Sequence, residues 1–412
     1  MTTSAPADSV WEARRAIAAD SMVSSAIREL LKLTEQENMI SFAGGLPSPT
    51  CFPAEEIALA SERVLATQAA RVLQYGPTPG LLPLRELCAS IMTKRGMAID
   101  ASNILITSGS QQALDVLGKL LIDPGDLVLV EDPTYLGALQ AWRPYRPRFF
   151  TLPMDDQGLR VDVLRERLQE LEAASEQPKF LYVVSNFQNP TGVTLSAARR
   201  EALLDLAEEH HLPIIEDDPY GELRYSGESI PPLAALDMRR HGTPHHVVYL
   251  STFSKLLAPG LRVGWVTAPA WMLKRIEQVK EGIDLHTGTL AQAIAYESCR
   301  DGLLDRHIPY IRSVYGQRRD TMLKALESHM PPTVRWTKPE GGMFLWITLP
   351  EQYDGVQVLE RAVKKSVAFV PGQAFHANGG GSNTMRLNFS YSSPELLDLG
   401  VRRLAEVLSE LT

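Results

Sequence analysis

The sequence contains little cysteine, no long apolar segment and no excess of basic charge, and each shortage excludes a class of protein. The three cysteines, Cys51, Cys88 and Cys299, are far apart and form no C-x-x-C pair, so we expect neither a disulfide framework nor a metal site. No apolar run approaches the roughly 20 residues of a membrane-spanning helix. The segment 1–20 also lacks the apolar core of a signal peptide, which predicts a cytoplasmic protein.

Basic residues are outnumbered by acidic ones, 41 to 49, so the chain carries a net charge of −8. A nucleic-acid-binding surface needs a basic face, so we expect no nucleic-acid partner. The lack of an apolar span likewise predicts no membrane partner. What the chain does have is length and apolar content. With 412 residues, 44% of them hydrophobic, it can bury a large core and form about two or three domains.

Short apolar runs alternate with helical patterns over the first 300 or so residues. This alternation predicts an α/β fold whose mainly parallel sheet is buried on both faces. In such sheets ligands bind at the carboxyl ends of the strands, so the polar residues that follow these runs are expected around one crevice. The runs are "NILIT" (103–107), "DLVLV" (126–130), "KFLYVV" (179–184), "LPII" (212–215), "HVVYL" (246–250) and "RVGWVTA" (262–268).

The last hundred or so residues show a different order of elements. A long helical pattern over 303–330 is followed by strand-like segments around a Gly-Gly turn, further strands at 367–372 and 384–391, and an amphipathic helix over 394–411. This order predicts a smaller α+β domain that begins near residue 300.

Lys255 lies in "STFSKLLAPGLRVGW" (251–265), directly after an apolar run. Most lysines lie on solvated surfaces, and that is the default interpretation of any single lysine. The apolar flanks oppose it here, because a desolvated lysine prefers its neutral form and is then a nucleophile for carbonyl groups. Arg262, in the same stretch, could hold a dianion.

Three acidic residues, Glu216, Asp217 and Asp218, follow the run "LPII". At least one is expected to point inward, where a buried carboxylate needs a cationic partner or a proton. The alternative is a helix cap, with Asp218 directly before Pro219 at the first helical position. Both hold if Asp217 is the buried residue.

Two further motifs are weak when taken alone. The Ser-Gly-Ser turn of "SGSQQALDVLGKLL" (108–121) opens a helix whose free N–H groups and dipole can bind an anion, although a plain capped helix is the commoner case. Asn189, before a proline, by itself indicates only a turn. Together with Lys255 and Asp217, these parts match pyridoxal phosphate, which offers an aldehyde, a ring nitrogen, a phenolate and a phosphate.

A series of longer motifs extends from about residue 21 to the end of the chain: "ISFAGGLPSPTCFP", "LQYGPTPGLLPLREL", "ITSGSQQALD", "EDPTYLGALQA", "NFQNPTG", "EDDPYGELRY", "STFSKLLAPGLRVGW", "DLHTGTLAQ", "PEGGMFLW", "VAFVPG" and "NTMRLNFSY". This series resembles the class I, fold-type I aminotransferases that use pyridoxal phosphate, and within them the 2-aminoadipate and kynurenine branch. The resemblance implies the mainly parallel, seven-stranded type of sheet of that fold. It implies an N-terminal arm with a substrate-side helix over 1–45, a large cofactor-binding domain over 46–300 and a small domain over 301–412.

The resemblance also implies roles in holding the cofactor. Lys255 would bind the cofactor aldehyde covalently and, once freed, move a proton between the substrate α-carbon and the cofactor, for which its pKa has to lie well below about 10.4. Asp217 would keep the pyridine nitrogen protonated, and Tyr135 would stack on the ring. Tyr220 and Asn189 would hydrogen-bond the phenolate oxygen. The phosphate would be held by Ser110, Gln111, Thr252, Ser254 and Arg262.

On the substrate side, the resemblance assigns Arg386 to the α-carboxylate. Arg386 lies in an otherwise apolar, strand-like segment, and a guanidinium fork matches a carboxylate with two hydrogen bonds. An internal salt bridge is the alternative. Asn189 and Gly45 would line the space for the substrate.

Two residues are implied to act at the edge of the site. Tyr75 would reach the cofactor and substrate of a partner subunit, which implies a homodimer with shared active sites. Arg28 lies on a predicted helix over 24–33 and could pair with a distal substrate carboxylate, as in glutamate or 2-aminoadipate. A solvated arginine on a helix surface is an equally open interpretation.

The implied reaction is a ping-pong transfer of an amino group between an aromatic, branched or 2-aminoadipate-like L-amino acid and a 2-oxo acid, with 2-oxoglutarate as the expected acceptor. A lyase or decarboxylase with the same fold and cofactor is the first alternative. A regulator with an aminotransferase-like sensing domain is a more distant one.

Overall fold

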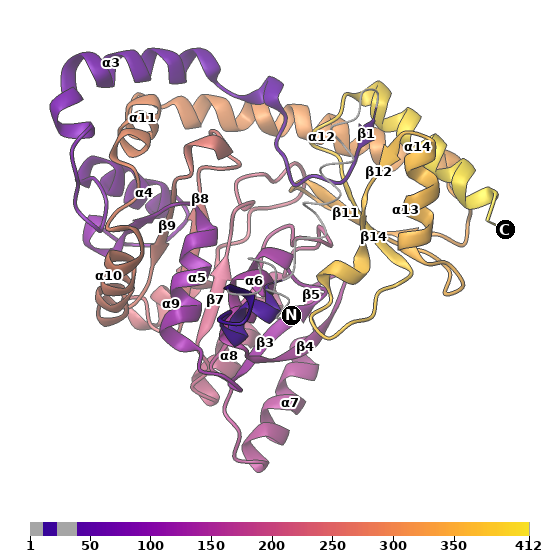
Figure 1. The fold of residues 1–412 in the computed structure, drawn as a ribbon, viewed down its shortest axis with the longest axis horizontal. Coiled ribbons are helices and arrows are strands. Elements are labelled where there is room, and N and C mark those ends of the chain that lie inside the picture. The colour runs from indigo at the N-terminus through magenta and orange to yellow at the C-terminus, as the bar shows by residue number, and fades with distance from the viewer. Residues whose placement is uncertain (1–10, 23–38, 412) are drawn as a thin grey trace, which may run out of the picture.

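The computed structural model describes residues 11–22 and 39–411 of the chain. Two sheets organise this part of the molecule (Figure 1). A large sheet of eight strands carries the α/β part, and a sheet of four strands carries a smaller C-terminal part, drawn in orange and yellow. The α/β class and the smaller α+β part predicted from the sequence are therefore confirmed. The helix predicted over 24–33 lies outside the described residues.

The large sheet has the strand order β2-β9-β8-β7-β6-β3-β4-β5. Strands β4, β3, β6, β7 and β8 run parallel to one another, whereas β9 runs antiparallel to β8 and β2, and β5 runs antiparallel to β4. The two-residue β5 is an addition to the seven-stranded type of sheet that was expected. The strands are β2 Leu105–Thr107, β3 Leu127–Asp132, β4 Arg148–Asp155, β5 Gly158–Leu159, β6 Phe180–Val183, β7 Ile214–Asp217, β8 Val247–Thr252 and β9 Gly264–Thr267.

The reversal of β9 has a simple cause in the chain. Only residues 253–263 separate β8 from β9, and no α-helix lies among them. A parallel return needs a crossover of a dozen or more residues, whereas an antiparallel return does not. The short connection that contains Lys255 therefore folds back as a tight loop at the carboxyl end of β8.

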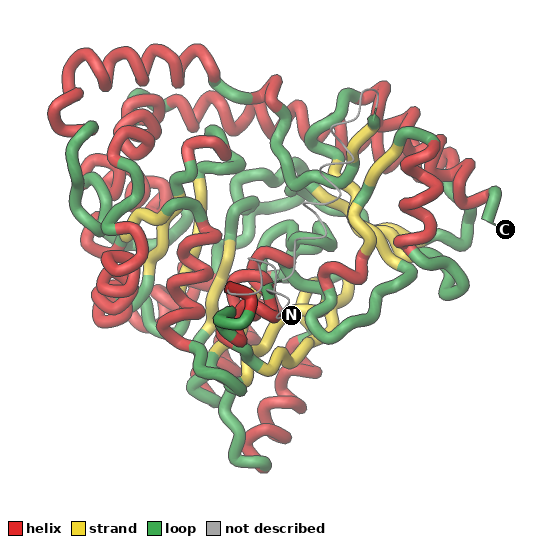
Figure 2. The backbone as a smooth tube through the Cα atoms, in the orientation of Figure 1, coloured by secondary structure: helices red, strands yellow, loops and turns green. Residues whose placement is uncertain are grey.

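Helices cover the large sheet (Figure 2). Strands β6, β7 and β8 are buried along their whole length, as expected for parallel strands with both faces covered. The helices of this part are α3 Ala54–Val72, α4 Leu82–Lys94, α5 Ser110–Leu121, α6 Leu136–Trp142, α7 Val161–Ala173, α8 Ala197–Glu209, α9 Leu233–His241, α10 Ala270–Asp284 and α11 Thr289–Cys299. Within the described ranges every helix is too short or too polar to cross a bilayer.

The smaller part has its own core. Its antiparallel sheet has the order β10-β11-β14-β13, and β1 pairs with β12 beside it. Helix α12 Leu303–His329 connects the two parts, with Ile311 in the first core and Leu326 in the second. The remaining elements are β1 Ile40–Ser41, β10 Arg335–Trp336, β11 Phe344–Thr348, α13 Gly355–Lys364, β12 Val367–Ala368, β13 Val370–Pro371, β14 Thr384–Asn388 and α14 Pro394–Ser409.

Candidate active site

The carboxyl ends of β6, β7 and β8 open onto one cavity of about 360 Å³. Strand β14 of the smaller sheet contributes Arg386 to it. All the residues to which the resemblance gives a role at the cofactor or substrate line this cavity except Tyr75 and Arg28: they are Gly45, Ser110, Gln111, Tyr135, Asn189, Asp217, Tyr220, Thr252, Ser254, Lys255, Arg262 and Arg386. Val184, Pro219 and Pro259 complete the lining.

Lys255 lies in the turn that follows β8, partly buried at the cavity. Its Nζ donates a hydrogen bond to the carbonyl oxygen of Gly45 at 2.7 Å. Burial, followed by the nearby charges of Arg386 and Arg262, lowers the pKa of Lys255 to about 8. An amine with this pKa is substantially neutral in mildly alkaline solution, so it can act as a nucleophile or accept a proton.

The acidic triplet after "LPII" divides into three functions, because side chains alternate along the strand end. Glu216 accepts hydrogen bonds from the first backbone N–H groups of α9, at Leu233 and Ala234, both at 2.9 Å. Asp218 forms an ion pair with Arg95 and accepts from the Gly221 N–H at 2.8 Å. The alternative considered above, a helix cap at Asp218, does not hold, since the chain continues there in a turn rather than a helix.

Asp217 is the member of the triplet that faces the cavity. Its Oδ2 accepts a hydrogen bond from Tyr182 at 2.9 Å, whereas its buried Oδ1 has no partner among the described residues. Burial raises the pKa of Asp217 to about 7. A buried carboxylate with one unsatisfied oxygen is suited to a charged N–H donor in the cavity.

The loop before α5 and the loop after β8 together form an anion cradle. Gly109 has φ +79°, and a Cβ there would lie 2.6 Å from Nη2 of Arg262, so glycine is required for this close approach. The hydroxyls of Thr252 and Ser254 are 2.8 Å apart. The first N–H groups of α5, which begins at Ser110, have no partner within the helix.

The side chain of Gln111 is turned away from this anion cradle. Its Nε2 donates to the carbonyl oxygen of Gly137 in α6 at 2.7 Å, which links α5 to the neighbouring helix. What Gln111 can offer an anion is therefore its backbone N–H at the helix N-terminus, rather than its amide group.

A buried hydrogen-bond network that sequence reasoning missed supports the turn at Ser108, which precedes the anion cradle. Gln112 accepts from the Ser108 N–H at 2.8 Å and from Nζ of Lys280 at 2.7 Å, and it donates to Asp284 at 2.6 Å. Lys280 also bonds Asp284 directly at 2.8 Å, and its side chain is fully buried. The i, i+4 spacing of Lys280 and Asp284 on an amphipathic helix was the available signal.

The side chain of Arg386 extends from strand β14 of the smaller sheet into the cavity. Its Nη1 donates to Oδ1 of Asn189 at 2.8 Å, its Nη2 donates to the Ala43 carbonyl at 2.6 Å, and its buried Nε has no partner among the described residues. The guanidinium also lies 4.2 Å from the centre of the Phe344 ring. Burial lowers the pKa of Arg386 to about 10, so it stays charged at neutral pH. The internal salt bridge considered above is absent among the described residues.

Two phenols, the buried Tyr220 and the partly buried Tyr135, complete the cavity. Burial raises the pKa of Tyr135 to about 12 and that of Tyr220 further, so both hydroxyl groups remain protonated at neutral pH. Tyr220 packs edge-on against Phe344, with ring centres 5.9 Å apart. Both phenols can therefore donate a hydrogen bond to an anionic oxygen in the cavity.

These features fit pyridoxal phosphate. The unsatisfied Oδ1 of Asp217 suits a protonated ring nitrogen, and Lys255 suits the aldehyde. The anion cradle suits the phosphate, because it combines a helix N-terminus with the Arg262 guanidinium and two hydroxyls.

Tyr75 and Arg28 are the residues that the cavity does not include. Tyr75 is 79% exposed on this chain, with its ring edge against His286. Arg28 lies outside the described residues.

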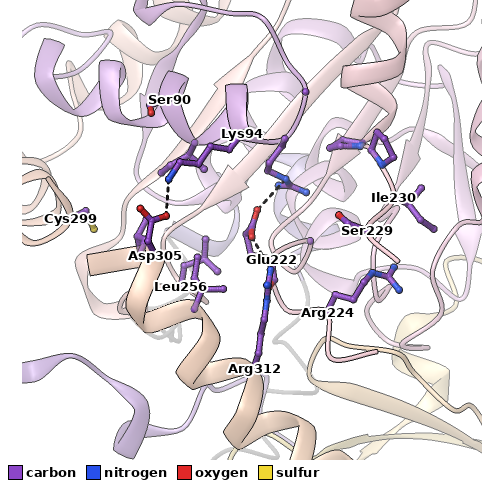
Figure 3. A pocket seen from close by; sticks show the side chains of 18 of the residues that line it. Ser90, Lys94, Glu222, Arg224, Ser229, Ile230, Leu256, Cys299, Asp305 and Arg312 are labelled. Atoms are coloured by element: carbon purple, nitrogen blue, oxygen red, sulfur yellow. Dashed lines mark hydrogen bonds and ion pairs between the residues drawn. The ribbon is translucent and has the colours of Figure 1, made fainter. Parts of the chain in front are cut away.

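A larger cavity of about 680 Å³ lies beside α4, α12 and the loop after β7 (Figure 3). Several of its charged side chains pair with one another. Lys94 bonds Asp305 at 2.7 Å, and Arg312 bonds Glu222 at 3.1 Å. Size therefore does not identify the reactive site here, whereas the combination of an amine, a carboxylate and an anion cradle in the smaller cavity does.

Comparison with known proteins supports this assignment. A family model described as aminotransferase class I and II matches residues 37–404. Aromatic-amino-acid aminotransferase 1 of Thermococcus litoralis is 51% identical over 390 residues, which cover 94% of this chain and 92% of that protein. A solved multiple substrate aminotransferase of Thermococcus profundus is 49% identical with a TM-score of 0.91, covering 97% of this chain and 98% of that one.

A third relative brings the cofactor into the comparison. The alpha-aminoadipate aminotransferase of Thermus thermophilus, solved with N-(5'-phosphopyridoxyl)-L-leucine, is 41% identical with a TM-score of 0.90, covering 97% of this chain and 98% of that one. The fold, the family and the cofactor expected from the sequence are thereby confirmed. The chain belongs to the class I and II aminotransferases and is a fold-type I transaminase that depends on pyridoxal phosphate.

Proposed function

We propose that the protein transfers the amino group of an aromatic, branched or 2-aminoadipate-like L-amino acid to a 2-oxo acid, with 2-oxoglutarate as acceptor, in a ping-pong order. The observation that carries this proposal is the incomplete hydrogen bonding of the Arg386 guanidinium. A fully buried guanidinium with an unpaired Nε and no carboxylate partner in the described structure suits the α-carboxylate that amino acids and 2-oxo acids share.

In this proposal the bound cofactor supplies an electron sink for the substrate α-carbon. Lys255, with its pKa lowered to about 8, takes up and returns the proton at that carbon. Asp217 holds the proton of the ring nitrogen through the oxygen that Tyr182 leaves free. Tyr220 and Asn189 direct hydrogen bonds to the phenolate oxygen, while Tyr135 covers the ring.

The cradle residues would hold the phosphate, which would keep the cofactor within reach of Lys255 and Asp217. Thr252 ends β8, and Ser254 and Arg262 follow on the same loop as Lys255, so one short segment would both bind the phosphate and present the amine. We assign this work to a large domain over 46–300, and substrate carboxylate recognition to a small domain over 301–412.

The relatives support the proposed range of donors. One is named for aromatic amino acids, one for multiple substrates, and one for alpha-aminoadipate while carrying a leucine adduct. Gly45 adds some space to the cavity by lacking a side chain, and a Cβ there would lie 3.5 Å from Phe344, an ordinary contact distance rather than a clash.

The test is a half-reaction. Amino acid added alone should convert the visible band of the cofactor to that of its amine form, and 2-oxoglutarate added afterwards should restore it. A panel of donors then ranks the side chains. Release of ammonia or carbon dioxide in place of an oxo acid would instead identify a lyase or a decarboxylase.

We further propose a homodimer in which Tyr75 enters the partner's cavity. The exposed ring of Tyr75 on this chain supports this arrangement. Tyr75→Ala and Lys255→Ala, each inactive alone, should regain activity when the subunits are mixed, because one cavity of the hybrid then has both residues intact. No recovery in a verified hybrid would show that Tyr75 acts within its own chain.

A further inference from the structure

Three histidines and an aspartate gather where α9 ends and β8 begins, outside the active site. Asp237 and His241 lie on the last turns of α9, and His245 and His246 precede the first residue of β8. The ligand atoms of these four residues all lie within 4.8 Å of one another. The spacing D-x3-H-x3-H-H is visible in the sequence, although the cysteines alone had predicted no metal site.

The distances in this cluster approach those of a coordinated ion. Nδ1 of His245 lies 3.0 Å from Nδ1 of His246. Oδ1 of Asp237 lies 3.6 Å from Nδ1 of His246 and 3.8 Å from Nε2 of His241. Around a tetrahedral ion with bonds of about 2.0–2.1 Å, ligand atoms are about 3.3 Å apart. Small side-chain movements are therefore enough to close the shell.

The backbone already holds the cluster in place. Asp237 is 1% exposed, and its carboxylate accepts hydrogen bonds from the N–H groups of His245 at 2.9 Å, His246 at 3.2 Å and Val247 at 3.3 Å. A carboxylate oxygen has further lone pairs, so these bonds orient Asp237 without preventing coordination. Gly242, at φ +75°, ends α9 and turns the chain back toward it.

We propose that Asp237, His241, His245 and His246 bind one zinc ion per chain. Imidazole nitrogens with a carboxylate oxygen are a ligand set for Zn²⁺ and related transition metals, and not for Mg²⁺ or Ca²⁺, which prefer oxygen ligands. His245 and His241 are exposed, so an ion can enter from solvent.

The surrounding charges permit this binding. His241 gives up its contact with Glu208, which lies 3.3 Å from its Nε2. Glu208 remains engaged by Arg240 at 3.1 Å, and Arg240 itself is neutralised by Asp205 and Glu201 as well. The Arg240 guanidinium therefore does not repel the cation with its full charge.

The ion would fasten the end of α9 to the start of β8. That strand extends from the cluster to Thr252 at about 3.3 Å per residue, so the two sites lie at opposite ends of it. The metal is thus a structural ligand of the folded state, which raises thermal stability without entering the reaction.

The experiment uses untagged holoenzyme stripped of metal and titrated with Zn²⁺ by calorimetry. We expect one ion per chain and an unfolding temperature that rises by a few degrees with Zn²⁺. Co²⁺ in its place should give the visible absorption of a tetrahedral site. His245→Ala and His241→Ala should each weaken Zn²⁺ binding at least about 10-fold.

His329→Ala is the matched control, since His329 is also partly exposed and faces a carboxylate, that of Asp398 at 3.4 Å. It should retain the Zn²⁺ affinity of the wild type. Equal affinity in wild type, His245→Ala and His241→Ala would overturn the proposal, as would the absence of stoichiometric binding. The transamination rate serves as the folding control for each variant.

Discussion

Buried cations occur in two settings in this molecule, the wall of the active cavity and the interior that supports it. In the interior, Lys280 bonds Asp284 and Gln112, and Arg200 donates to three backbone carbonyls and to Asn186. In the wall, Lys255 has one carbonyl partner and Arg386 leaves Nε unpaired.

The comparison shows which buried charges belong to the fold and which are held for a ligand. An unsatisfied buried polar group costs about 1–3 kcal/mol, more when it is charged. Lys280 and Arg200 avoid that cost by internal pairing. The wall accepts it, so that the cofactor and the substrate become the missing partners.

The largest effect is expected at Lys255. Lys255→Ala removes both the covalent link to the cofactor and the proton carrier, so kcat/KM should fall by about 10²–10⁴-fold. Steady-state kinetics and the visible spectrum measure the two losses. Lys94→Ala, an exposed lysine paired with Asp305, should leave both unchanged. Near-normal turnover by Lys255→Ala would show that the buried cations of the cavity wall are not held for a ligand.

The second largest effect is expected at Arg386, which can be compared with Arg200 in the interior. Arg386→Lys loses the fork that matches a carboxylate, so kcat/KM for amino acids should fall about 100-fold, with little change in stability. Arg200→Lys leaves backbone carbonyls unsatisfied and should lower the free energy of unfolding while KM stays the same. Thermal melts and kinetics on both variants test this, and a reversed pattern would contradict it.

Asp217 gives a smaller effect that depends on pH. In cofactor-free protein, Asp217 stays protonated up to about pH 7 when folded, whereas the unfolded chain loses this proton near 3.8. The folded state binds more protons between these values, so stability falls as pH rises through them. Between pH 5 and 7 the free energy of unfolding of the wild type should therefore fall by about 2 kcal/mol more than that of Asp217→Asn.

Denaturant titrations of both cofactor-free proteins at the two pH values measure this difference. Saturation with cofactor should reduce it, because the ring nitrogen then pairs with Asp217. An equal pH dependence in wild type and variant would show that Asp217 is ionised in the empty cavity.

The smallest effect is expected from the supporting network. Lys280→Met removes a bond to Gln112 and thereby loosens the Ser108 turn, so the affinity for the cofactor should fall about 10-fold. The reaction rate at saturating cofactor should hardly change. Equilibrium dialysis measures the first and kinetics the second, and a loss confined to the rate would refute a positioning role.

The sequence predicted the strands and the site residues where a local pattern of residues has few structural interpretations. Apolar runs located six strands of the large sheet, and the polar residues after them indicated the cavity. Strand β4, with its proline and mixed exposure at the far side of β3, carried no such signal.

Partners across long separations could not be predicted. A helix cap was the local alternative for Asp218, but its partner is Arg95, 123 positions away. The bonds from α10 through Gln112 to the Ser108 turn likewise arise only when helices pack. Such pairings depend on tertiary geometry, which local patterns do not encode.

Helix α12 belongs to both hydrophobic cores, and the cavity draws on both as well, through Lys255 after β8 and Arg386 on β14. A substrate bound between Lys255 and Arg386 would form a second, reversible connection between the large and the small part of the molecule. Its fit therefore depends on the spacing between two sheets as much as on the cavity lining. Substitutions along α12 that alter this spacing give evolution a route to new substrates that leaves every cavity residue unchanged.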